Sequence, residues 1–176
     1  MPSLRVPEHP KGQIIMQSPY PPLNLPDAAL SLRESNGRTE VYDFIRHRYI
    51  ILTPEEWVRQ HVSAYLLSQK SVPANLIAIE KKLEVNKLVK RFDLVVFDRN
   101  IRPLLLAECK APGVKISESV FDQAARYNLT IKAPLFLVTN GLEHYCCRID
   151  FENRLYVFLN EIPPFDGMLQ IADEMS

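Results

Sequence analysis

Three apolar segments in close succession constrain the fold of this chain more than any other feature. They cover Leu76–Val85, Arg91–Phe97 and Leu104–Lys110, each is rich in Leu, Ile, Val or Phe, and short charged or Asn-containing connections separate them. Segments of this length and composition are typical of strands, and such short connections favour antiparallel neighbours. We therefore predict a meander of antiparallel strands at the centre of the domain.

A helical pattern lies on each side of this meander. The first helix is predicted to begin after Thr53, because Pro54 fits the first helical position and Glu56 stands at capping-box spacing. It extends to about Gln69, and a second helix is predicted over about Glu118–Ile131. The side chains expected on the apolar side of the second helix are Val120, Ala124 and Leu129.

Further strand-like segments precede the first helix and follow the second. Residues 39–52 mix aromatic, β-branched and basic side chains, which predicts one or two short strands after a turn at Asn36-Gly37. A tight turn is predicted at Asn140-Gly141, and closing strands are predicted at Leu135–Thr139, His144–Ile149 and Leu155–Phe158. The order of elements predicts an α/β domain in which helices cover a central mixed sheet.

Proline placement divides the chain into two parts. Seven of the 14 prolines lie within the first 26 residues, where their fixed φ and missing N–H discourage both helix and interior strand. We predict a proline-rich arm over residues 1–38 and a folded domain over residues 39–176. The arm is expected to lie over the domain or to reach a neighbour, which makes a homodimer one expected partner arrangement.

Charge is balanced overall but unevenly distributed. The chain has 21 Lys+Arg and 21 Asp+Glu, whereas residues 80–115 hold nine basic and five acidic side chains. A local positive field suits a polyanion such as DNA, and a solvated charged face explains the same count equally well. Lys90, Arg91 and Lys115 are the candidates for contact with nucleic-acid phosphates, and for Lys90 and Arg91 ordinary ion pairing is the alternative.

Cysteine use and hydropathy give an expected location. The three cysteines form neither a disulfide framework nor a metal-binding C-x-x-C pair, and a reducing, cytoplasmic compartment is therefore expected. No apolar stretch approaches the length of a membrane span, so no membrane association is expected.

Charged side chains stand where two of the predicted central strands meet. Asp93 begins the apolar part of one strand, whereas Glu108 and Lys110 end the next and share one face of it. In an antiparallel pair the start of the first strand lies beside the end of the second. Two carboxylates and an amine at the end of a buried sheet are costly unless they are paired or bind a cation. The sequence therefore predicts a polar site at this point.

These residues resemble a known group of proteins. Asp93 followed by Glu108-Cys109-Lys110 resembles the D…E-x-K signature of the PD-(D/E)xK nuclease superfamily. Gln123 and Tyr127 resemble the Q-x-x-x-Y element of many such nucleases. Over residues 40–150 the chain is similar to the N-terminal nuclease domain of type I restriction enzyme R subunits, on the segments Thr53-Pro54-Glu55-Glu56-Trp57-Val58-Arg59-Gln60, Arg91-Phe92-Asp93 and Glu108-Cys109-Lys110-Ala111-Pro112.

The resemblance implies a restriction-endonuclease-like fold and a metal-dependent endonuclease acting on DNA, with other restriction or repair subunits as partners. Mg²⁺ or Mn²⁺ is implied as the cofactor, and hard oxygen ligands suit such a cation. Lys110 is implied to orient or deprotonate the attacking water, and the sequence leaves open whether burial lowers its pKa or the carboxylates hold it up. The implied metal ligands are Asp93, Glu108, the carbonyl of Cys109 and Glu56, and the implied phosphate contacts or supports of Lys110 are Gln123 and Tyr127.

Each of these assignments has a structural alternative. Glu108 and Lys110 can form a surface salt bridge, Asp93 can cap a turn, and Glu56 is explained by its capping position alone. Gln123 can be a solvated helix residue, and Tyr127 can be a core aromatic. At the level of function, the alternatives are a catalytically silent nucleic-acid-binding or assembly module on the same scaffold, and a structural domain that dimerises through its arm.

Overall fold

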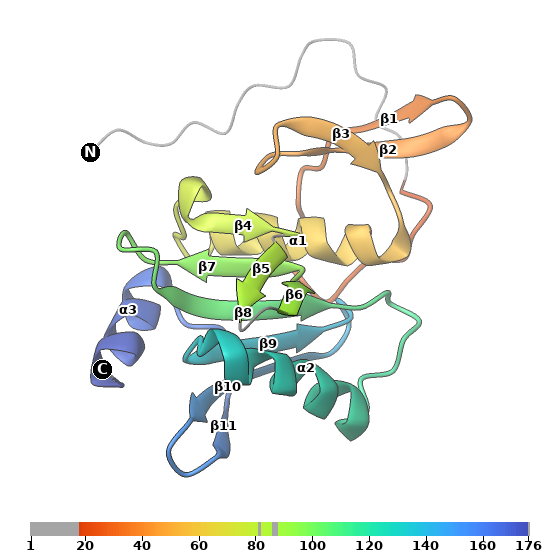
Figure 1. Ribbon diagram of the computed structural model, residues 1–176. Helices are drawn as coiled ribbons and strands as arrows, with labels where there is room; N and C mark the ends of the chain where they lie inside the picture. The colour runs from red at the N-terminus through yellow and green to blue at the C-terminus, as the bar shows by residue number, and fades with distance from the viewer. Residues whose placement is uncertain (1–17, 81, 86–87, 176) are drawn as a thin grey trace.

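A six-stranded mixed sheet with helices on both faces forms the centre of the computed structural model (Figure 1). The structure describes residues 18–80, 82–85 and 88–175, and among these the side chains of residues 82–85, 88–91, 124 and 127 lie outside the description. The elements are β1 Leu32–Ser35, β2 Arg38–Asp43, β3 Arg48–Ile51, α1 Pro54–Ser68, the short 3-10 turn Ala74–Leu76, β4 Ile77–Ile79, β5 Lys82–Val85, β6 Leu88–Arg91, β7 Leu94–Phe97, β8 Pro103–Cys109, α2 Glu118–Ile131, β9 Leu135–Thr139, β10 His144–Asp150, β11 Leu155–Leu159 and α3 Phe165–Glu174.

The strand order across this sheet is β11-β10-β9-β8-β7-β4. The predicted antiparallel meander is confirmed at its centre, because β4 pairs with β7 and β7 pairs with β8 in antiparallel sense. Strand β9 lies parallel to β8, and α2 makes the crossover that a parallel pair requires. The sheet is therefore mixed, as the sequence predicts.

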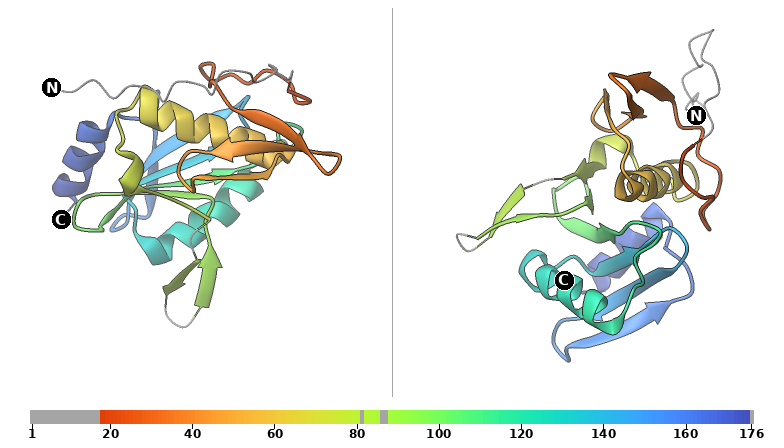
Figure 2. Two further views of the ribbon diagram at one scale, coloured as in Figure 1. Left: turned by 90° about the horizontal axis from the view of Figure 1, so that it is seen from above. Right: turned by 90° about the vertical axis from the view of Figure 1, so that its right-hand side faces the viewer.

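Alternating side chains of the central strands build two cores. On one face, α1 contributes Val58 and Val62 and α3 contributes Met168 to a buried cluster over the sheet. On the other face, Phe121 and Ala125 of α2 pack on a second buried cluster. Figure 2 shows α1 and α2 on opposite sides of the sheet. Because side chains alternate between the two faces along each strand, the central strands pack against helices on both faces of the sheet.

Two of the predicted strands are each divided in the structure. Leu76–Val85 becomes β4 and β5, and Arg91–Phe97 becomes part of β6 together with β7. The division follows Ile79, the last residue of β4 paired with β7, because Glu80 takes a left-handed φ of 49° that turns the chain out of the sheet. Strands β5 and β6 pair with each other as a separate hairpin that projects from the domain (Figure 2).

The helical predictions need two corrections. The bounds of α2 are as predicted, but Leu129 is 53% exposed, and the side that faces the core carries Phe121 and Ala125 instead. Asn128, three residues after Ala125, is fully buried, so the buried side of the helix passes through Asn128 and turns away from Leu129. The sequence-based reading also omitted α3, whose buried Met168 and Ala172 repeat at helical spacing after two prolines.

The segment before α1 forms its own small sheet and packs on the domain. Strands β1, β2 and β3 pair in antiparallel order, and the one or two strands predicted in residues 39–52 are found as two, β2 and β3. Strand β1 lies wholly within the predicted arm, before residue 38. Tyr20 donates a hydrogen bond to the carbonyl of Leu52, and Trp57 donates one to the carbonyl of Pro21. The division of the chain at residue 38 stays a prediction, and residues 1–17 of the predicted arm lie outside the described residues.

Of the helices in the described ranges, none is both long and apolar enough to cross a membrane.

Candidate functional site

Asp93 and Glu108 meet where β7 begins and β8 ends. Leu94 pairs with Ala107 in the antiparallel ladder, which places Asp93 opposite Glu108. One carboxylate oxygen of Asp93, Oδ2, accepts a hydrogen bond of 2.8 Å from the backbone N–H of Cys109. The predicted convergence of Asp93 with the E-x-K segment is therefore present.

Glu108 and Lys110 form an ion pair on one face of the strand end. The Lys110 ammonium donates to Oε1 of Glu108 at 2.7 Å, and the two side chains keep 30% and 21% of their surface exposed. Burial and the Asp93 charge raise the pKa of Glu108, and the Lys110 hydrogen bond only partly opposes this. Burial alone would lower the pKa of Lys110, but its hydrogen bond to Glu108 and the nearby carboxylates raise it. The ammonium form of Lys110 is therefore favoured.

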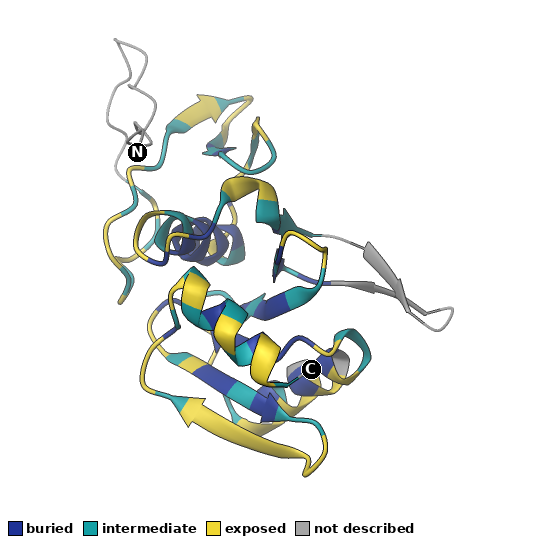
Figure 3. Cartoon of the chain, turned by 90° about the vertical axis from the view of Figure 1, so that its left-hand side faces the viewer, coloured by how far each residue is buried: buried dark blue, intermediate teal, exposed yellow. Residues whose placement is uncertain are grey.

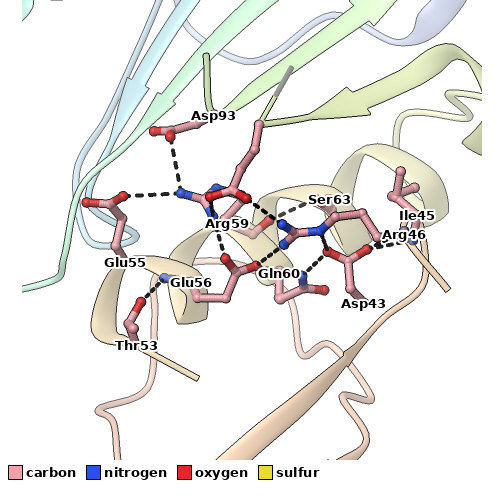
Figure 4. Close-up of polar contacts among 11 residues, drawn as sticks. Asp43, Ile45, Arg46, Thr53, Glu55, Glu56, Arg59, Gln60, Ser63 and Asp93 are labelled. Carbon is pink, nitrogen blue, oxygen red and sulfur yellow. Dashed lines mark hydrogen bonds and ion pairs between the residues drawn. The ribbon is translucent and has the colours of Figure 1, made fainter. Parts of the chain in front are cut away.

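Helix α1 brings Arg59 and Glu55 to the same place. Nη2 of Arg59 donates to Oδ1 of Asp93 at 3.1 Å and to Oε1 of Glu55 at 3.2 Å (Figure 4). The Glu55 charge also contributes to raising the pKa values of Glu108 and Lys110, so this carboxylate lies within electrostatic range of the strand ends. Glu55 and Arg59 received no role from sequence reasoning, although their spacing of four residues on a predicted helix indicates an ion pair.

Glu56 lies deeper, within the protein. It is 5% exposed, and both of its carboxylate oxygens are engaged. Oε1 accepts hydrogen bonds from Arg46 at 3.1 Å and Gln60 at 2.8 Å, and Oε2 accepts a short one from Arg59. Its backbone N–H also donates to Thr53 at 3.1 Å, so the predicted cap is confirmed. The metal role of Glu56 stays a prediction, and Glu55 is the neighbouring carboxylate that reaches Asp93 through Arg59.

A buried ionic network holds α1 in this position (Figure 4). Asp43, the fully buried last residue of β2, accepts hydrogen bonds from the backbone N–H groups of Ile45 and Arg46, and from the side chains of Arg46 and Gln60. Burial alone would raise the pKa of Asp43, but these hydrogen bonds and the Arg46 charge outweigh it and lower the pKa. Arg46 also pairs with Glu80 at 2.7 Å, which links the network to the end of β4.

Comparison with known proteins places this geometry in a family. The model of the family described as type I restriction enzyme R protein N terminus matches residues 54–163. The chain belongs to that family. The matched segment of this HsdR N-terminal family member contains α1, the Asp93 and Glu108 strand ends, and α2.

The fold of a solved structure agrees with this assignment. A fragment assigned as an HsdR subunit of a type I restriction enzyme from Vibrio vulnificus YJ016 matches with a TM-score of 0.53 at 18% sequence identity. The match covers 70% of this chain and 26% of that one, so the present HsdR N-terminal family member spans about a quarter of the length of that structure. No curated protein matches. The predicted resemblance and the predicted fold class are thus confirmed.

The donor atoms of this HsdR N-terminal domain suit a hard cation. Asp93 and Glu108 offer carboxylate oxygens at one strand end, and such oxygens are what Mg²⁺ and Mn²⁺ prefer. Burial raises the pKa of Glu108 and the like charge of Asp93 adds to it, so nearby positive charge favours the ionised form of both carboxylates. Arg59 and Lys110 supply that positive charge here. Within residues 18–80, 82–85 and 88–175, no three His, Cys, Asp or Glu side chains are grouped to hold a metal ion.

The remaining predicted residues are placed less completely. Gln123 is exposed on α2, and Lys115 is exposed in the loop between β8 and α2. Among the described contacts, none joins Gln123 to Asp93, Glu108 or Lys110. The side chains of Tyr127, Lys90 and Arg91 lie outside the described residues. Their assigned roles therefore stay predictions.

Proposed function

We propose that this chain is the metal-dependent endonuclease domain of a restriction-type enzyme and that it hydrolyses phosphodiester bonds of DNA. The observation that carries the proposal is the Asp93 hydrogen bond to Cys109, which fixes one carboxylate beside Glu108 and Lys110. Membership in the HsdR N-terminal family supports it. The partners proposed with it are DNA and the other subunits of a restriction enzyme.

Asp93, Glu108 and the carbonyl of Cys109 are the groups proposed to hold Mg²⁺ or Mn²⁺. When bound, the ion supplies charge neutralisation at the phosphate and a water of lowered pKa. Glu55 is the proposed additional carboxylate in preference to Glu56, because both Glu56 oxygens are held by arginines and Gln60. Arg59 already joins Glu55 to Asp93, so it aligns both carboxylates.

Lys110 is proposed to act as a cation. Because its pKa is raised, its ammonium form persists at neutral pH, and an ammonium group donates hydrogen bonds but accepts no proton. Its proposed work is to orient the attacking water and to offset the charge that develops on the phosphate. The Glu108 carboxylate is the proposed acceptor of the proton from water, whose pKa a bound ion would lower.

The test is cleavage of supercoiled plasmid and of single-stranded DNA with Mg²⁺ or Mn²⁺, compared with EDTA. We expect Glu108→Gln to lose cleavage and Lys110→Ala to lose most of it. Glu152→Gln removes an exposed carboxylate from the β10–β11 turn and should cleave like the wild type. Intact substrate with the wild-type chain under all conditions, or equal loss in Glu152→Gln, argues against catalysis at this site.

A second function fits one specific observation. The Asp93 and Glu108 charges are already partnered by Arg59 and Lys110, and a domain with zero net charge and satisfied strand ends can serve as a silent binding or assembly module. DNA affinity that persists in EDTA and in Asp93→Ala, without any cleavage, would favour this function. DNA affinity that requires the divalent ion would favour the nuclease.

A further inference from the structure

Strand β11 is an open edge of the central sheet and is unusually apolar. It is the last strand in the order β11-β10-β9-β8-β7-β4, and it pairs only with β10 within the described sheet. Leu155, Val157 and Phe158 keep 58%, 54% and 57% of their surface exposed. Figure 3 shows this strand coloured mainly as exposed. Edge strands are normally protected by charge, proline or a bulge, and residues 155–159 contain neither a charged residue nor a proline.

The two faces of β11 have different side chains. Phe158 and Tyr156 pair with Cys147 and Ile149 of β10, which belong to the α2 core, and both rings contact Phe121, with centroids 5.5 and 5.6 Å away. The intervening residues point to the opposite, α3 face of the sheet. These are Leu155, Val157 and Leu159.

We propose that β11 pairs with β11 of a second copy of this chain, antiparallel, about a two-fold axis through Val157. The strand sequence Leu-Tyr-Val-Phe-Leu reads nearly the same in both directions by side-chain type. In this register Leu155 lies opposite the partner's Leu159, and Tyr156 lies opposite the partner's Phe158. Aromatic and aliphatic cross-strand pairs of this kind stabilise an antiparallel ladder.

Only one register pairs all five residues with apolar partners. The two-fold axis is perpendicular to the sheet, and residues that lie opposite one another must share a face of it. Each allowed axis therefore lies midway between one residue and its own copy. Moving the axis to Tyr156 places Arg154 opposite an aromatic ring, and moving it to Phe158 places Asn160 opposite one. The sequence of β11 therefore specifies the axis at Val157.

The charges beside the strand favour the same arrangement. Arg154 precedes β11, and Glu161 follows it with a side chain that is 76% exposed although it pairs with Lys70. In the proposed register Arg154 faces the partner's Asn160, the residue before Glu161, so an antiparallel partner brings opposite charges to the same end of the pair. A parallel partner brings like charges together. The contact uses the β11 edge of both copies and is closed by its two-fold symmetry, so this contact builds a dimer with one continuous sheet.

The inference does not rest on the proposed nuclease function, and its first test is the mass of the full chain in solution. Light scattering after size exclusion, over a dilution series, should give twice the 20.3 kDa chain mass at the higher concentrations. Val157→Lys places two like charges on the axis and should weaken the dimer about tenfold or more. Ile101→Lys changes a side chain that is 73% exposed in the β7–β8 turn and should leave the dimer unchanged.

A cysteine pair tests the register itself. Val157→Cys faces its own copy across the axis and should form a disulfide-linked dimer under mild oxidation, because directly opposite strand residues are within bonding reach. Leu155→Cys faces the partner's Leu159 and lies about 13 Å from its own copy, so it should stay uncrosslinked. The three native cysteines are buried and serve as an internal control.

Several results would overturn the proposal. These are a monomer at every concentration, a dimer that Val157→Lys leaves intact, and crosslinking of Leu155→Cys as complete as that of Val157→Cys. Circular dichroism and thermal melting of each variant establish that it is folded, so that loss of the dimer is not loss of the domain.

Discussion

The carboxylate of Asp93 and the backbone N–H of Cys109 are joined by a hydrogen bond of 2.8 Å, although the residues lie 16 positions apart. This bond ties the chain entering β7 to the last residue of β8. The second oxygen of Asp93 is held by Arg59 of α1 at 3.1 Å. One carboxylate thus connects two strands and a helix, so its replacement affects the geometry of the whole site.

Replacing Asp93 with Asn removes the charge of this side chain while keeping nearly the same shape, so it tests the role of the charge alone. The amide oxygen can still accept from Cys109, but the negative charge that faces Arg59 and any bound cation is lost. We expect DNA cleavage to fall about 10²-fold or more and Mn²⁺ affinity to fall with it, while the thermal midpoint changes little. Plasmid cleavage, titration calorimetry with Mn²⁺ and thermal melting measure the three quantities. Full Mn²⁺ affinity in this variant would contradict a ligand role for Asp93.

Arg59 is expected to be the most important residue of the site for stability. It is 4% exposed and compensates the carboxylates of Glu56 and Asp93. Arg59→Met removes one cation from both carboxylates. Glu56 keeps Arg46 and Gln60, and Asp93 keeps the backbone N–H of Cys109. Removing one partner of a buried ion pair typically costs about 3–5 kcal/mol. Urea unfolding at pH 7 measures the loss.

The control for this prediction is Arg148→Met. Arg148 pairs with Glu174 at 3.1 Å between side chains that are 38% and 49% exposed, and such pairs contribute about 1 kcal/mol or less. Equal losses in the two variants would show that the Arg59 network stabilises no more than a surface ion pair.

The strand ends of this site could be predicted from the sequence, but the contribution of helix α1 could not. Asp93, Glu108 and Lys110 could be placed because antiparallel pairing and the period of two follow from local pattern alone. The choice between Glu55 and Glu56 depends on how α1 is rotated against the sheet, and that rotation is set by Arg46 and Asp43, which precede the helix.

The elements show the same division between local pattern and tertiary contact. The start of α1 was predictable because its capping signals are local. The division of the long strand segments at Glu80 and Asp93 was not, because a hydrogen bond of 3.0 Å between their backbones forms only after the chain has left the sheet and returned. Helix α3 begins directly after Pro163 and Pro164. Because proline has a very low helix propensity, propensity alone does not predict a helix there.

Glu108 is predicted to reduce stability while it supports function. Its pKa is raised in the folded chain, so the ionised form is disfavoured by folding and the cost is present above that pKa. Glu108→Gln removes the charge, and we expect the thermal midpoint at pH 7 to rise by about 2 °C while cleavage is lost. The gain should vanish at low pH, where wild-type Glu108 is protonated. A lower midpoint at pH 7 would show that the Lys110 pair outweighs the burial of Glu108.

Asp43 gives the opposite dependence on pH. Its pKa lies below the ordinary value of 3.8 in the folded chain, so its contribution to stability is present above that value and is lost as the pH falls through the folded pKa. Asp43→Asn replaces acceptors for four hydrogen bonds with one acceptor and a misplaced donor, which should cost about 2–4 kcal/mol at pH 7.

The difference between the wild type and Asp43→Asn should begin to narrow below about pH 4, where Asp43 of the unfolded chain takes up its proton, and should close as the pH falls through the lower pKa of folded Asp43. Urea unfolding at pH 7 and pH 3 measures it, and Asp122→Asn, an exposed change on α2, should cost less than about 0.5 kcal/mol at both. A loss for Asp43→Asn that is the same at both pH values would mean that its geometry, and not its charge, holds the turn after β2 against α1.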